Sequence, residues 1–189
     1  MNFVESIILD IVLLLFPLLV YLIYIAYKKN LNQEERGLFL EIALFSSLYL
    51  IMRYGIVQKT GFLVILYNIP LLISYFKGRK FTPIIISIVL IWYYVAVMQF
   101  NFFFIFFEYV IYYCIYVYIM QKRLTQHHII NTFVLVKAAI LSFQTFCFTN
   151  PHASFMDNFL HVFIVILMFY IVSYLIFYLL LKGEEIMDL

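Results

Sequence analysis

Long apolar runs alternate with short polar segments along the whole chain. Seven runs are apolar enough to form helices inside a membrane: residues 7–27, 38–52, 61–76, 83–98, 102–120, 129–148 and 159–181. A helix crosses the hydrocarbon core with about 20 residues, so the second, third and fourth runs must lengthen into their flanks. The pattern predicts an all-α, polytopic transmembrane helical bundle with seven spans. Six spans are the alternative if the second or third run is re-entrant.

Polar residues in front of three runs are typical of helix starts. Asn32 can cap a second helix that begins early, with Glu35 at the capping-box position. The Thr-Pro pair at 82–83 has the residue types of an N-cap and a first helical residue. Ser154 and Asp157 have the spacing of a capping box at the start of the seventh helix.

Basic residues are distributed unequally over the polar segments. Nine of the twelve Lys and Arg residues fall on one side of a seven-span topology, in segments 28–37, 77–82, 121–128 and 182–189. Arg53 and Lys59 fall on the other side, and Lys137 lies within a run. Because cytoplasmic segments carry an excess of Lys and Arg, we expect the N-terminus outside and the C-terminus inside. Orientation accounts for the net charge of +2, and we expect no nucleic-acid partner.

The composition agrees with a chain that is almost entirely within lipid. Of the 189 residues, 67% are apolar and 12% are charged, and the mean hydropathy is +1.05, whereas an average soluble domain is about half apolar and a quarter charged. Residues 1–181 are predicted to form a single transmembrane domain, followed by a cytoplasmic tail over 182–189. The segments between the runs are too short for a soluble catalytic domain of about 100 residues. The chain also carries no Walker A, H-E-x-x-H or G-x-S-x-G motif. We therefore expect no enzyme and no cofactor.

Two charges lie deep within predicted spans, where each needs a physical reason. Glu108 lies about 10 Å into the fifth run from one side, and Lys137 about 12 Å into the sixth run from the other, at the rise of an α-helix. These runs are consecutive and antiparallel, so we expect an intramembrane ion pair that locks the two helices or acts as a switch. The alternatives are that each side chain reaches the membrane surface separately or that Glu108 is protonated. Asp10 and Glu41 lie near the ends of their runs and are expected to reach the headgroups.

Other candidate residues carry weaker signals. Pro17 and Pro70 are predicted to kink the first and third helices and to act as hinges. His152, Asp157 and His161 have a spacing that suits a divalent metal, since residues four apart share a helix face. The competing interpretation is that Asp157 caps the helix, and it is the one that the capping-box spacing from Ser154 favours.

Two apolar segments resemble a known family. The first run contains Phe16-Pro17 and Tyr21, and the third contains the sequence Tyr-Asn-Ile-Pro-Leu-Leu at 67–72 before a basic turn. Both resemble the N-terminal membrane module of KinB-type, sporulation-type sensor histidine kinases, and more loosely that of LytS-type proteins. The charged tail at 182–189 is similar to the start of the linker that leads to a kinase core in that family. Neither the phospho-accepting His region nor the ATP-binding region is present in this chain.

The resemblance implies a signal-input, or sensor, module in a bacterial cytoplasmic membrane, signalling by helix repacking. Besides the lipid bilayer, the implied partners are a second copy of the chain, a small apolar ligand or a protein partner. Two other classes remain open. One is a small transporter or its membrane substrate-binding subunit, whose hallmark is a polar cavity near mid-membrane. The other is an assembly partner of a larger membrane complex.

Overall fold

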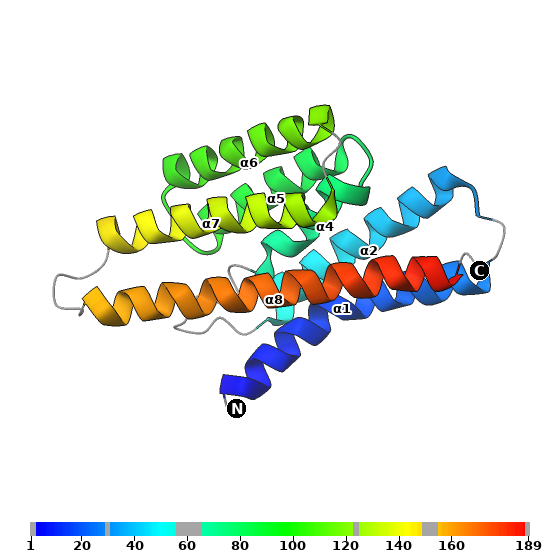
Figure 1. The fold of residues 1–189 in the computed structure, drawn as a ribbon, viewed down its shortest axis with the longest axis horizontal. Coiled ribbons are helices and arrows are strands. Elements are labelled where there is room, and N and C mark those ends of the chain that lie inside the picture. The colour runs from blue at the N-terminus through cyan, green and yellow to red at the C-terminus, as the bar shows by residue number, and fades with distance from the viewer. Residues whose placement is uncertain (1–2, 29–30, 56–65, 123–124, 149–154, 188–189) are drawn as a thin grey trace. The chain divides into compact units, whose positions relative to one another are not determined.

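The computed structural model describes residues 3–28, 31–55, 66–122, 125–148 and 155–187. Every regular element within these residues is an α-helix, which confirms the predicted all-α class. The helices are α1 (Phe3–Tyr27), α2 (Gln33–Tyr54), α4 (Asn68–Lys77), α5 (Thr82–Ala96), α6 (Phe102–Lys122), α7 (Gln126–Phe148) and α8 (Phe155–Met187). Figure 1 shows their order along the chain.

The helix starts follow the polar residues that precede the apolar runs. α2 begins at Gln33, and the backbone N–H of Asn32 donates to the Glu35 carboxylate at 3.2 Å. α5 begins at Thr82. The prediction made Thr82 the N-cap and Pro83 the first helical residue, so the helix starts one residue earlier than predicted. The Thr82 hydroxyl donates to the side chain of Glu41, so this hydroxyl links two helices. Ser154, predicted to cap the last helix, lies outside the described residues.

Among the described residues, four helical segments are long and apolar enough to cross a membrane: Ile7–Tyr27, Gln33–Tyr54, Phe102–Ile119 and Val162–Ile186. Large apolar side chains are exposed along the helices, among them Ile23, Leu135 and Phe163, as expected for surfaces that face lipid. α5 is apolar but shorter, α4 has ten residues, and α7 is not among the four. A membrane protein is therefore supported, while the count of seven spans and their orientation stay predictions.

The described chain forms two compact units. The first contains Met1–Leu90 and Ser173–Leu189, and the second contains Ile91–Val172. α5 and α8 contribute residues to both units, because each helix continues through a boundary between them. The single domain expected over 1–181 stays a prediction.

In the first unit, α1 and α2 are antiparallel neighbours joined by a short connection (Figure 1). Their core includes the fully buried side chains of Leu14, Leu44, Leu48 and Ile51. α8 approaches α1 closely at Gly183, where a Cβ atom would lie 2.7 Å from a methyl carbon of Leu22. Because lipid solvates apolar side chains as well as protein does, such close approaches and interhelical hydrogen bonds specify which helices associate.

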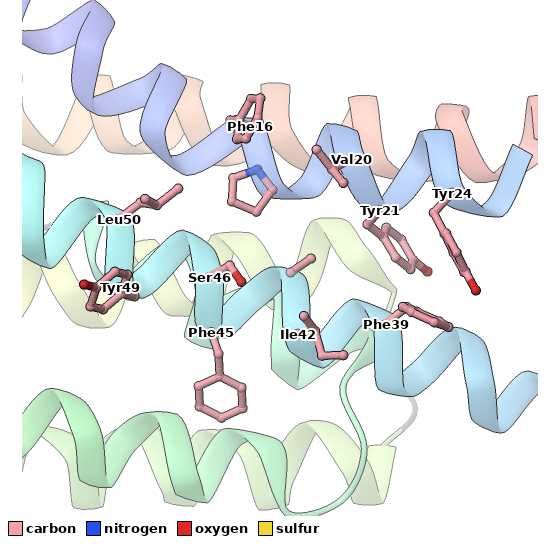
Figure 2. Close-up of a pocket in the computed structure, with 12 residues that line it drawn as sticks. Phe16, Val20, Tyr21, Tyr24, Phe39, Ile42, Phe45, Ser46, Tyr49 and Leu50 are labelled. Atoms are coloured by element: carbon pink, nitrogen blue, oxygen red, sulfur yellow. The ribbon is translucent and has the colours of Figure 1, made fainter. Parts of the chain in front are cut away.

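The bend in α1 is supported by a hydrogen bond from α2. Pro17 lies inside α1 and lacks the N–H that would bond to the carbonyl of Leu13. The hydroxyl of Ser47 donates to the neighbouring carbonyl of Leu14 at 2.9 Å in a buried position. α1 changes direction part-way along its length in Figure 1, and the close-up of Figure 2 places this change beside Phe16. Ser47 thus contributes a polar contact where the proline weakens the helix.

Replacing Ser47 by alanine is expected to lower the free energy of unfolding by about 0.6 kcal/mol and at most about 1.7 kcal/mol, the mean and the maximum measured for hydrogen bonds between membrane helices. Reversible unfolding in mixed micelles, followed by loss of helical circular dichroism, measures this difference. Ser46→Ala is the matched control, since its side chain is half-buried at the adjacent position. Equal losses for the two variants would contradict a specific role for the Ser47 bond.

Candidate functional site

The second unit brings Glu108 and Lys137 together. Glu108 projects from α6 and Lys137 from α7, and the Lys137 ammonium donates to Oε1 of Glu108 in an ion pair. Their side chains are only 4% and 5% exposed, respectively. A charge at such a position is stable only when it is paired and hydrogen-bonded. The pair therefore provides a polar link between two helices whose other faces are largely apolar.

Tyr112 completes the environment of the carboxylate. It lies one helical turn after Glu108 on α6, and its hydroxyl donates to the same Oε1 atom at 2.9 Å. The Lys137 Nζ atom lies 6.0 Å from the centre of the Tyr112 ring, within the range of a cation–π interaction. One tyrosine therefore contacts both charges, through its hydroxyl and through its ring.

A series of aromatic rings connects the ion pair to α8. The Tyr112 ring stacks on Phe133 of α7, with centroids 4.5 Å apart and an angle of 16° between the planes. The Phe133 ring is in turn 6.4 Å from that of Phe169 on α8. All three rings are buried, so a continuous series of ring contacts runs from the pair to the first half of α8.

A cavity of about 410 Å³ lies beside the pair, between α6 and α7. Glu108 contributes to its wall, together with Phe104, Phe107 and Ile111 from α6 and Phe143 from α7. The rings of Phe104 and Phe143 are nearly parallel, with their centroids 6.4 Å apart. This volume is in the range of small-molecule sites, which combine apolar walls with a few polar groups. A fitting ligand is apolar and carries a polar group that can reach Glu108.

The first unit contains two further polar clusters, one around Glu184 and one around Glu41. Glu184 of α8 accepts a hydrogen bond from the Tyr21 hydroxyl at 2.9 Å and forms an ion pair with Lys77. Glu41 accepts from Thr82, and its other oxygen lies 3.6 Å from Nη1 of Arg79. The sequence placed Glu184 in the charged tail at 182–189, with no contact expected, and Glu41 was expected to reach the headgroups. The basic residues at 77–80 were the only available signal for these partners.

The structure places the two predicted hinge prolines and Asp10 as follows from their positions in the helices. Pro17 is in the interior of α1, whereas Pro70 is the third residue of α4 and lies in its first turn, where a missing N–H leaves no helical bond broken. A hinge at either proline stays a prediction. Asp10, expected near a membrane surface, is only 2% exposed within the protein. Sequence reasoning missed its burial.

The side chains of the three predicted metal ligands lie outside the part of the chain that the structure describes. His152 lies outside the described residues, and the side chains of Asp157 and His161 are not described either. Within the described part of the chain, no group of three or more His, Cys, Asp or Glu side chains could hold a metal ion.

No protein-family model matches the chain, and no curated protein and no solved structure is significantly similar to it. The resemblance to sensor histidine kinase modules therefore depends on the segments around Pro17 and at 67–72 and on the charged tail.

Removing one member of the buried pair should destabilise the protein strongly. Lys137→Met or Glu108→Gln is expected to lower the free energy of unfolding by about 3–5 kcal/mol, because each leaves its partner buried without a counter-charge or full hydrogen bonding. The combined Glu108→Gln/Lys137→Met variant should lose less than the sum of the two. Unfolding in mixed micelles measures the full double-mutant cycle.

The control for this cycle is Glu185→Gln, which breaks an ion pair with Lys182. This pair is exposed, since the Lys182 side chain is 50% and the Glu185 side chain 64% exposed. Its expected effect is below about 1 kcal/mol. The exchanged variant Glu108→Lys/Lys137→Glu should regain most of the loss seen in the singles. Strictly additive single losses would show that the two side chains do not act as a pair.

Proposed function

We propose that the chain is a membrane-embedded signal-input module, similar to the sensor modules of bacterial histidine kinases. The observation that supports this most is the buried Glu108–Lys137 pair, which borders a cavity and is connected through Tyr112 and Phe133 to α8. α8 has 33 residues, and the charged tail predicted to lie inside follows its apolar part. The arrangement places an ion pair at the wall of a cavity and provides a continuous helix along which a change can pass.

The proposed signal is a change in helix packing caused by a ligand in the cavity. A polar group of the ligand competes with Lys137 and Tyr112 for the Glu108 carboxylate, and the apolar body occupies the space between the phenylalanine rings. Such a ligand shifts the equilibrium only if it binds the two packings with different affinity. The ion pair supplies that difference, because one packing keeps it and the other replaces it with ligand contacts.

The nature of the cavities favours this proposal over a transporter. The space beside Glu108 and the groove between α1 and α2 are both lined mainly by apolar side chains. A transporter of polar substrates requires a polar cavity near mid-membrane. An apolar or amphiphilic ligand fits these walls better than a polar one.

We further propose seven spans with the N-terminus outside and the C-terminus inside the bacterial cytoplasmic membrane. The contacts of Lys77 with Glu184 and of Arg79 with Glu41 support this arrangement. Through the first contact, the C-terminal ends of α4 and α8 lie next to each other. Through the second, the connection between α4 and α5 lies next to α2. For the ends of α4 and α8 to lie on the same side, the chain must cross the membrane an even number of times between residues 82 and 187. The proposed spans α5, α6, α7 and α8 give four crossings.

Single cysteines test the topology in a background with Cys114→Ser and Cys147→Ser. A membrane-impermeant maleimide added to intact cells should label cysteines at Tyr54 and Asn101, whose side chains are exposed in the structure. Cysteines at the exposed positions Lys80 and Thr125 should react only after the membrane is opened. Labelling of positions 101 and 125 from the same side would contradict a crossing by α6.

A fusion tests the sensor role. The core of a sensor histidine kinase is joined in frame after Leu189, and its autophosphorylation is measured in membrane vesicles. Lys137→Met should change the basal rate several-fold, since the aromatic contact with α8 is altered, and the Glu108→Lys/Lys137→Glu exchange should return it toward the original value. Leu135→Ala, at a position 70% exposed on the same helix, is the control. Unchanged rates in a folded Lys137→Met fusion would refute signalling through the pair.

A further inference from the structure

An open groove of about 630 Å³ lies between α1 and α2 in the first unit (Figure 2). Its walls include Phe16 and Val20 of α1 and Ile42 and Tyr49 of α2. These four side chains are 49–62% exposed. The groove is therefore an apolar surface that the helices of this unit leave uncovered.

The length of the groove matches one leaflet of a bilayer. Its lining on α2 extends from Phe39 to Leu50, eleven helical steps or about 16 Å at the rise of an α-helix. The hydrocarbon core is about 30 Å thick, so the groove covers about half of it. An acyl chain from a single leaflet has the extent and the chemistry that this surface requires.

One end of the groove carries a positive charge. The rings of Tyr24 and Phe39 meet there with centroids 4.1 Å apart, and the Lys28 ammonium lies 6.0 Å from the Tyr24 ring. Lys28 follows the last residue of α1 and is exposed, and among the described residues it forms no ion pair. A cation placed where the apolar walls end complements the phosphate of a lipid headgroup.

We propose that this groove binds an acyl chain of an anionic phospholipid from the leaflet next to the connection between α1 and α2. The chain lies along Val20 and Ile42, and the phosphate contacts Lys28. Tyr21 also lines the groove, and its hydroxyl donates to Glu184 on α8. A bound lipid therefore contacts a residue that positions the end of α8.

The test measures lipid binding by the full chain, purified in detergent and delipidated, with native mass spectrometry. Phosphatidylglycerol and phosphatidylcholine with identical acyl chains are added separately. The original protein should retain one phosphatidylglycerol molecule in preference to phosphatidylcholine. Lys28→Gln should reduce the affinity for phosphatidylglycerol about fivefold and leave the affinity for phosphatidylcholine unchanged. Lys122→Gln, an exposed cation at the end of α6, controls for general loss of charge.

A second variant separates the groove from the rest of the lipid-facing surface. Val20→Trp fills the groove and should remove the retained molecule of either lipid. Ile23→Trp adds the same bulk at a position of α1 that is 66% exposed and does not line the groove, and it should bind lipid normally. Ile42→Trp fills the groove from the opposite wall and replaces Val20→Trp if that variant loses its helical circular dichroism.

Two results overturn the proposal. One is equal retention of both lipids by the original protein, which removes the anionic preference. The other is equal binding by folded Val20→Trp and Ile23→Trp, which removes the groove as the site. Neither result bears on the kinase fusion, because lipid retention is measured without any cytoplasmic output.

Discussion

A charged group buried in an apolar interior requires a partner within the protein, because no water is there to solvate it. The pair formed by Glu108 and Lys137 meets this requirement for α6 and α7. Apolar contacts alone do not choose between a neighbouring helix and lipid, so the pair identifies α6 and α7 as partners and fixes how they meet. The stacking of Tyr112 on Phe133 and the walls of the adjacent cavity depend on that alignment.

The same principle operates in the first unit through weaker contacts. Glu184 connects α8 to α1 and α4, and Gly183 beside it allows the close approach of α8 to Leu22. α8 thus carries an aromatic contact near its middle, at Phe169, and a polar contact near its end, at Glu184.

Local patterns were enough to predict the helices, since apolar runs and capping residues act over a few positions. The depth of Glu108 and Lys137 in consecutive antiparallel helices was enough to suggest their contact. Tyr112 was missed although it follows Glu108 by one turn, a spacing that places both on the same helix face. The contact between Tyr21 and Glu184 joins residues 163 positions apart. No local signal reports it, because it arises only when α1 and α8 pack together.

The hydrogen bond from Ser47 to the Leu14 carbonyl has a mechanical consequence for the first unit. A proline lowers the stiffness of a helix, and a free helix could bend at Pro17 in several directions. Here the carbonyl next to the weakened turn is tethered to α2, so changing the bend of α1 requires either breaking a buried bond or moving α2 as well. The Ser47 hydroxyl therefore couples the bending of α1 to the position of α2.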